Sequence, residues 1–202
     1  DPSEPIPFGP QQSQASYMDR VRRCQDYIAA GDLYQANLSH RFSVTSPRFA
    51  PNSGLASELQ AYARLRAMNP SPFSGLLRID GTSFISTSPE RLVRLAGRQA
   101  DTRPIAGTRP RGRDAADDRR LIEELRASEK ERAEHLMLVD LERNDLGRVC
   151  EYGTIKVSDF FTVEKYSHVM HIVSHVAGHL RADRTPYDLM RVTFPAGTLT
   201  GA

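Results

Sequence analysis

The sequence has 202 residues, of which 39% are hydrophobic and 26% are charged. This length is sufficient for one large hydrophobic core or two small ones, and the composition is typical of a globular protein rather than a disordered chain. No apolar run approaches the roughly 18 residues of a membrane-spanning helix, so we expect no membrane association. The first residues do not resemble a secretory signal peptide, because they lack both a basic segment and an apolar core.

The charge balance and the cysteines limit the class of protein further. The 27 basic residues, nearly all arginine, exceed the 25 acidic ones only slightly. Arginine binds carboxylates through two parallel hydrogen bonds, whereas a nucleic-acid-binding surface requires a larger positive excess, so nucleic acid is not an expected partner. Cys24 and Cys150 are too far apart for a disulfide framework or a clustered zinc site, which favours a cytoplasmic location.

The N-terminal part of the chain predicts an arm, two helices and one strand. Residues 1–12 contain four prolines and predict a linker or arm. A helix is expected from Ser13 to Gly31, since apolar side chains recur at helical spacing and glycine favours a helix end. Alternating side chains predict a strand over 33–44, and a second amphipathic helix is expected over 55–68.

Short strands and one long charged helical region make up the remainder. A helical pattern covers 114–142 with an interruption near Ser128, and Thr185 with Pro186 begins a last helix. The strand signals are short runs bounded by turn residues, at 73–80, 82–86, 91–95, 99–102, 154–163 and 166–176. Strands in runs, rather than in strict alternation with helices, predict an α+β fold of antiparallel sheets.

Glu131 and Glu134 are candidate metal ligands. Their spacing of three places both carboxylates on one face of a helix, and carboxylate oxygens are the ligands that Mg²⁺ prefers. The alternative is a solvated charged face beside Lys130 and Arg132, and the spacing by itself favours that alternative.

Four histidines lie close together in the sequence, but we expect them to be separated in space. On a helix, His168, His171, His175 and His179 would share one face and could bind zinc or haem. The interleaved β-branched residues favour a strand instead, on which His168 faces away from the other three. Four side chains spaced in this way along a strand cannot all bind one metal ion, so at most His171 is expected to be functional.

Three further segments carry polar side chains of interest. The arginine-rich turn around Gly107 and Thr108 suggests a site for a carboxylate, although a nucleic-acid patch or a solvated loop has the same composition. Glu90 follows a strand and could act as a general acid if burial raises its pKa, or form a surface ion pair. A buried Arg–Asp network that closes a helix is predicted for Asp140, Arg143, Asn144 and Asp145.

Taken together, these segments resemble the chorismate-utilising enzyme family, which includes the first components of anthranilate synthase and aminodeoxychorismate synthase, and the isochorismate and salicylate synthases. The resemblance covers nearly all of 13–202, which it identifies as the N-terminal and central part of the catalytic domain. It implies that the domain continues past Ala202, so we expect these residues alone to be inactive. The motifs that carry the resemblance are residues 31–42, 88–90, 103–109, 131–147, 166–174 and 194–198.

The resemblance implies a mechanism and a set of site residues. Chorismate is a dianion, and in this family Mg²⁺ is held by acidic side chains and by the substrate carboxylate. Glu131 and Glu134 match metal-site glutamates, Glu90 matches the acid that helps the C4 hydroxyl leave, and His171 matches the active-site histidine. The implied substrate-binding positions are Gln35, Ala106, Gly107, Thr108 and Thr198.

The resemblance also bears on the reaction type. Family members that add water carry a lysine where this chain has Gln35, which favours amination over isochorismate or salicylate formation. The ammonia is expected from a separate glutamine amidotransferase subunit, because the chain shows no Cys–His arrangement for glutamine hydrolysis. Asn37, Phe73 and Arg91 resemble aminodeoxychorismate synthase of the folate pathway. Ala106 and the 166–174 motif resemble anthranilate synthase of tryptophan biosynthesis, which stays as the alternative.

Overall fold

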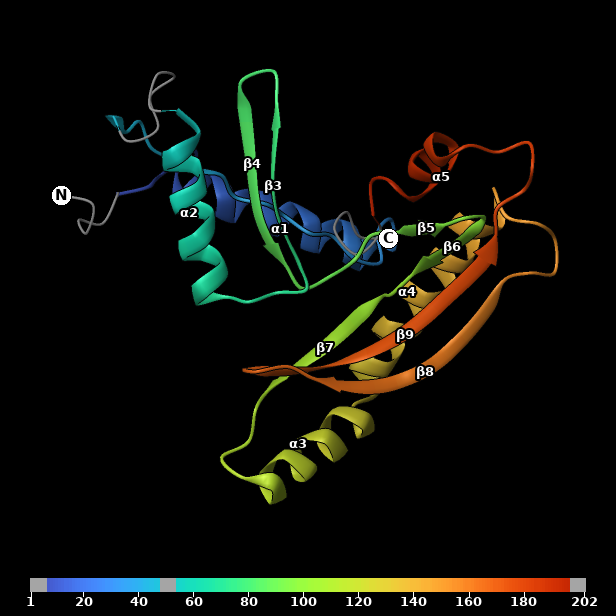
Figure 1. Ribbon diagram of the computed structural model, residues 1–202. Helices are drawn as coiled ribbons and strands as arrows, with labels where there is room; N and C mark the ends of the chain where they lie inside the picture. Colours follow the sequence, from blue (N-terminus) through green and yellow to red (C-terminus); the bar gives the residue numbers. More distant parts are fainter. Residues whose placement is uncertain (1–6, 48–53, 197–202) are drawn as a thin grey trace. The chain divides into compact units, whose positions relative to one another are not determined.

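A computed structural model describes residues 7–47 and 54–196. The chain divides into two compact units, and the boundary lies between Pro89 and Glu90 (Figure 1). Every helix in the described ranges is too short or too polar to cross a lipid bilayer. Each unit is described separately below.

The first unit contains helices and two small antiparallel pairs of strands. Its elements are β1 (Gly9–Pro10), α1 (Gln14–Ala30), β2 (Phe42–Ser43), α2 (Gly54–Met68), β3 (Phe73–Ile79) and β4 (Thr82–Ser88). β1 pairs with β2, and β3 forms a hairpin with β4. The Ser13 side chain caps α1 by accepting a hydrogen bond from the Ser16 backbone, and Gly31 ends the helix in the left-handed conformation. Both helices predicted in this region are confirmed.

The strand predicted over 33–44 is wrong, because only Phe42–Ser43 is extended and paired. The preceding residues instead contact α1 through side chains. The Tyr17 ring stacks on His40 with 5.2 Å between ring centroids, and its hydroxyl donates to the Leu38 carbonyl at 3.1 Å. These contacts hold the segment beside α1 without the ladder of backbone hydrogen bonds that the alternating pattern suggested.

The second unit is a five-stranded antiparallel sheet with helices. β9 (Val169–His179) is central: it pairs with β8 (Lys156–Lys165) along one edge, and with β6 (Gln99–Thr102) and β7 (Ile105–Pro110) along the other. β5 (Arg94–Ala96) extends the sheet beyond β6. This confirms the expected α+β fold with antiparallel strands and helices outside the sheet.

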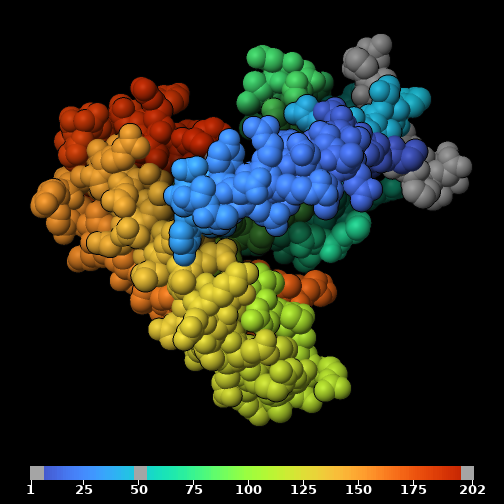
Figure 2. Space-filling view, turned by 180° about the vertical axis from the view of Figure 1, so that it is seen from behind, coloured from blue at the N-terminus to red at the C-terminus, as the bar shows by residue number. Residues whose placement is uncertain are grey.

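Three helices accompany the sheet. They are α3 (Ala115–Ala127), α4 (Glu129–Gly147) and α5 (Pro186–Thr193). In Figure 1, α4 passes behind the sheet and α3 lies below it, and the yellow surface of the two helices faces the viewer in Figure 2. Ser128 separates these two helices, as predicted, and its side chain caps α4 by accepting from the Glu131 backbone at 3.4 Å.

The core of the second unit joins the sheet to α4 and α5. Its buried side chains come from several elements and are Ala100, Val139, Leu146, Val149, Cys150, Val176, Leu180 and Leu189. Since α4 is held by these apolar contacts, the polar residues on the same helix are carried at fixed positions along the sheet.

Gly178 lies at a tight point of this core. A Cβ at this position would meet Ile155 Cδ1 at 2.5 Å and Cys150 Sγ at 2.9 Å. We therefore expect Gly178→Ala to lower the free energy of unfolding by about 1–3 kcal/mol, measured by chemical denaturation, because the core must shift to accept the methyl group. Gly147→Ala is the matched control, since a Cβ there meets nothing within 4 Å. Equal stability of the two variants would contradict the expectation.

Candidate active site

A β-bulge in β7 shapes the centre of the candidate site. Ala106 pairs with Ile172 and Thr108 pairs with His171, so Gly107 is an extra residue between two successive pairs. Gly107 has a φ of 66°, which favours glycine. A Cβ there would lie 2.9 Å from Leu125 Cδ1 and 3.1 Å from Glu131 Oε2. Glycine therefore allows the backbone of β7 to approach the carboxylate at the start of α4.

His171 and Thr108 meet directly beside this bulge. Thr108 Oγ1 lies 3.0 Å from His171 Nδ1, and the Gly107 carbonyl oxygen lies 3.3 Å from the same nitrogen. Burial lowers the pKa of His171, so the ring is neutral at neutral pH. Because Nδ1 is engaged by β7, Nε2 is the ring nitrogen that remains for a ligand.

Glu90 lies next to the first residue of β7. The Ile105 backbone hydrogen-bonds to its carboxylate, and Ile105 directly precedes the buried Ala106. Burial raises the pKa of Glu90, although the Ile105 hydrogen bond opposes the rise. A carboxyl group with a raised pKa is what a general acid near neutral pH requires.

Glu131 and Glu134 are both half-buried in the first turns of α4. Glu131 Oε1 accepts a hydrogen bond from Arg109 Nη1 at 3.4 Å, and Arg109 also pairs with Glu124 at 3.0 Å. Within the described ranges, no group of three or more His, Cys, Asp or Glu side chains is arranged to hold a metal ion. The oxygen donors and their spacing suit a hard cation such as Mg²⁺, but they form only part of the ligand set that it needs.

The structure thus gathers most of the site residues expected from the sequence along β7. The remaining two residues are Gln35 and Thr198. Gln35 belongs to the first unit, where it is half-buried between α1 and β2. Thr198 lies outside the described residues.

The remaining histidines have other surroundings. His175 and His179 lie on β9, as expected for a strand, while His168 precedes it. His175 Nδ1 lies 2.9 Å from Ser158 Oγ, and its Nε2 lies 3.5 Å from Asp101 Oδ1. His179 is exposed. The regular strand spacing therefore gives each histidine its own environment.

His135 is a buried polar residue that the sequence reasoning missed. It is fully buried, and its Nε2 lies 2.6 Å from Ser174 Oγ, which also accepts from the Phe161 backbone at 3.1 Å. Burial lowers the pKa of His135 to about 4. The one available signal was its place four residues after Glu131, on the same face of the helix.

The interpretation of the polar residues near the end of α4 as a buried network is wrong. Arg143 pairs with Asp140 at 3.1 Å, but 53% and 64% of these side chains are exposed. The pair lies one helical turn apart on the outer side of α4, where water screens its charges and its contribution to stability is small.

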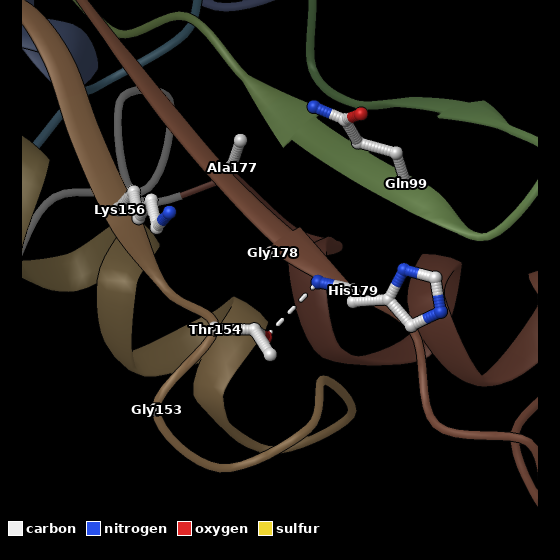
Figure 3. A pocket seen from close by; sticks show the side chains of 7 residues that line it. All are labelled: Gln99, Gly153, Thr154, Lys156, Ala177, Gly178 and His179. Atoms are coloured by element: carbon white, nitrogen blue, oxygen red, sulfur yellow. Dashed lines mark hydrogen bonds between the residues drawn. The ribbon is translucent and has the colours of Figure 1, made fainter.

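A pocket of about 350 Å³ opens elsewhere on the sheet (Figure 3). It is lined by residues from β6, β8, β9 and the loop before β8, namely Gln99, Gly153, Thr154, Lys156, Ala177, Gly178 and His179. The dashed line in Figure 3 marks the hydrogen bond from the His179 backbone to Thr154 Oγ1, 3.1 Å long. None of the site residues expected from the sequence lines this pocket, which is distinct from the bulge at Gly107.

Comparison with known proteins shows the family of the chain. The family described as chorismate binding enzyme matches residues 1–202. The chain therefore belongs to the chorismate-binding enzyme family, as the sequence motifs indicated.

The relatives include two kinds of enzyme. The chain is 50% identical to anthranilate synthase component 1 of Thermus thermophilus over 94% of its own length and 39% of that protein. It is 47% identical to aminodeoxychorismate synthase component 1 of Bacillus subtilis, with the same coverage. A crystal structure of anthranilate synthase component I from Streptococcus pneumoniae matches with a TM-score of 0.83 and 34% identity, over 98% of this chain and 42% of that one. The chain spans about two fifths of the length of these relatives.

The burial of His135 predicts a pH dependence of stability. The folded chain holds this ring neutral, so its stabilising effect is complete above the unfolded pKa of 6.5 and is lost as the pH falls toward about 4. We expect unfolding between these pH values to show a loss of up to about 3 kcal/mol that His135→Gln removes. The exposed His179→Gln variant serves as the control. Identical pH dependence of wild type and His135→Gln would show that the ring is not held neutral.

Proposed function

We propose that the polypeptide containing this chain catalyses the Mg²⁺-dependent amination of chorismate, with 4-amino-4-deoxychorismate as product. The observation that carries the proposal is the bulge at Gly107. It places Glu131 against the backbone of β7 and aligns Thr108 with His171, while Glu90 binds the backbone at the start of the same strand. The proposed acid, a histidine and the proposed metal-binding carboxylate thus surround one stretch of backbone.

Glu90 is the proposed general acid. The C4 hydroxyl of chorismate is a poor leaving group, and it leaves as water only when it is protonated. Burial raises the pKa of Glu90 and so keeps a larger fraction of the group protonated near neutral pH.

Glu131 and Glu134 are the proposed metal ligands of this chain. A bound Mg²⁺ would neutralise the ring carboxylate of the substrate and orient the ring. The side chains around the bulge complement this role. His171 keeps Nε2 available because Thr108 and the Gly107 carbonyl engage Nδ1, and the bulge leaves Gly107 without a pairing partner on β9.

Ammonia is the proposed nitrogen donor, supplied by a glutamine amidotransferase subunit. Glutamine hydrolysis by such enzymes uses a nucleophilic thiolate, which a low pKa favours. Of the two cysteines, Cys150 is buried and burial raises the pKa of its thiol, while Cys24 is half-buried on α1. Neither cysteine is fully exposed, and relatives that carry the designation component 1 are consistent with a second component.

Anthranilate is the second candidate product, and Ala106 is the observation that favours it. This side chain is buried at 5% exposure beside the bulge, so no lysine is present there to attack the substrate ring. Several of the similar proteins are named anthranilate synthase component 1. The resemblance of Asn37, Phe73 and Arg91 to aminodeoxychorismate synthase favours the first product.

A product assay on the complete polypeptide tests the proposal. With chorismate, ammonia and Mg²⁺, we expect a non-fluorescent aminated product that retains the enolpyruvyl group and releases no pyruvate. Fluorescent anthranilate together with pyruvate would establish the second candidate instead. Consumption of chorismate with water in place of ammonia would overturn amination altogether.

The metal ligands can be tested separately. We expect Glu131→Gln to raise the Mg²⁺ concentration required for half-maximal activity by roughly tenfold or more, because the amide is a weaker ligand for a hard cation. Glu129→Gln is the matched control, since Glu129 is exposed two residues earlier on the same helix. Equal Mg²⁺ requirements in the two variants would exclude Glu131 as a ligand.

A further inference from the structure

His135 attaches α4 to the central strand next to the proposed metal ligands. Its ring is fully buried, and its Nε2 lies 2.6 Å from Ser174 Oγ on β9. Among the residues that the structure describes, the other ring nitrogen has no hydrogen-bond partner. Buried polar atoms are nearly always paired in folded proteins, so the contact with Ser174 carries the whole polar attachment of this side chain.

Ser174 connects this point of α4 to two further segments of the second unit. Its hydroxyl oxygen accepts a hydrogen bond from the Phe161 backbone in β8 at 3.1 Å. Its own backbone N–H donates to the carbonyl of Pro104, just before β7, at 3.3 Å. The serine is fully buried, so water does not compete for these hydrogen bonds. The position of α4 is thereby tied to β8, β9 and the start of the strand that carries the candidate site.

Phe161 has a backbone conformation that needs support from its surroundings. Its φ of 56° lies in the left-handed region, which is rare for a bulky side chain. The residue belongs to an irregularity of β8, where the register with β9 shifts between Ser158 and Thr162. Its ring lies edge-on to the His135 ring, with 4.9 Å between centroids, and 5.7 Å from Arg132 Cζ. Such strain persists where neighbouring contacts hold it, often at functional sites.

These contacts lie on the face of α4 that bears the proposed metal ligands. His135 directly follows Glu134, and it is four residues after Glu131 on the same face of the helix. Glu131 accepts a hydrogen bond from Arg109 on β7 at 3.4 Å. The helix is therefore held at two successive turns, beside β7 and against β9. A shift of the helix at His135 would move both carboxylates, because the helical backbone transmits it to them.

We propose that His135 is a positioning residue for the carboxylates of Glu131 and Glu134, and that Ser174 supplies the hydrogen bond through which it acts. His135 binds neither the ion nor the substrate. It holds the first turns of α4 so that the two carboxylates keep the separation and direction that a divalent cation requires. This inference rests on the Mg²⁺ site of the proposed function. Residues that orient metal ligands commonly change the affinity of a metal site by tenfold or more.

The affinity for Mn²⁺ tests this role in the complete polypeptide without turnover. Mn²⁺ binds the same oxygen ligands as Mg²⁺, and the electron paramagnetic resonance signal of the free ion measures how much is bound. His135→Leu keeps an apolar side chain without the hydrogen bond, and we expect its Kd for Mn²⁺ to rise roughly tenfold. His135→Gln keeps an amide that can hydrogen-bond to Ser174, and its Kd should stay close to that of the wild type.

Ser174→Ala tests the same hydrogen bond from β9. This change removes only a hydroxyl group, so it remains informative if His135→Leu does not fold. We expect a similar rise in Kd, and a double variant that binds Mn²⁺ no more weakly than either single variant, because both changes remove one interaction. An unchanged Kd in Ser174→Ala, or losses that add in the double variant, would overturn the proposal.

The location of the measured ion is checked with Glu131→Gln, which should bind Mn²⁺ more weakly than the wild type. Wild-type protein that binds no Mn²⁺, or Glu131→Gln that binds it as tightly as the wild type, would overturn the proposal.

Two control variants separate positioning from a general loss of stability. Ser158→Ala breaks a second serine–histidine pair, in which Ser158 Oγ lies 2.9 Å from His175 Nδ1, on the opposite face of β9 from Ser174. Gly178→Ala disturbs the core beside the same strand. Both should bind Mn²⁺ with wild-type affinity under conditions in which they are folded. If Gly178→Ala weakens binding as much as His135→Leu does, stability alone explains the loss and the proposal fails.

The ion measurement and the product assay can fail independently. If chorismate is not aminated but the Kd values follow the expected order, the positioning role stands and the assigned reaction fails. If amination is observed, His135→Leu should need roughly tenfold more Mg²⁺ for half-maximal activity and reach the wild-type kcat at saturating Mg²⁺. A lower kcat at saturation with an unchanged Mg²⁺ requirement would refute the positioning role while the reaction stands.

Discussion

The close approach of the β7 backbone to the first turn of α4 is the contact on which the candidate site depends. Gly107 makes it possible in two ways: it adopts a positive φ, and it carries no Cβ to meet Leu125 and Glu131. The same extra residue changes the register with β9, so that Thr108 lies opposite His171. One bulge therefore positions a carboxylate from a helix and an imidazole from the central strand relative to a single peptide segment.

Burial is the second physical effect that shapes the site, and it acts differently on acids and bases. It raises the pKa of Glu90, and it lowers the pKa of His171 and His135. In each case burial favours the uncharged form of the group. Groups whose uncharged form is favoured would not repel the carboxylates of the substrate proposed above, and hydrogen bonds in a place with little water are not weakened by solvent.

The sequence was most informative where local chemistry decides the structure. Helix ends could be predicted because capping depends on a few neighbouring atoms. The residues that mark them are Ser13, Gly31, Ser128 and Thr185. The segment 33–44 was misassigned because alternation does not reveal whether a partner strand exists. His135 was missed for a related reason: its surroundings come from β8 and β9, which are distant in sequence. Composition suggested a buried network of charged side chains near the end of α4, whereas helix geometry turns Asp140 and Arg143 toward water.

The cap at Ser128 bears on the metal site proposed for this chain. Its hydroxyl accepts from the Glu131 backbone, so the residue that bears the proposed ligand also closes the end of the helix. Helix ends fray, and a frayed first turn would move Glu131 and Glu134 apart. Ion binding and the ordering of this turn are then thermodynamically linked: the cation would tighten the turn, and any contact that tightens the turn would strengthen retention of the cation.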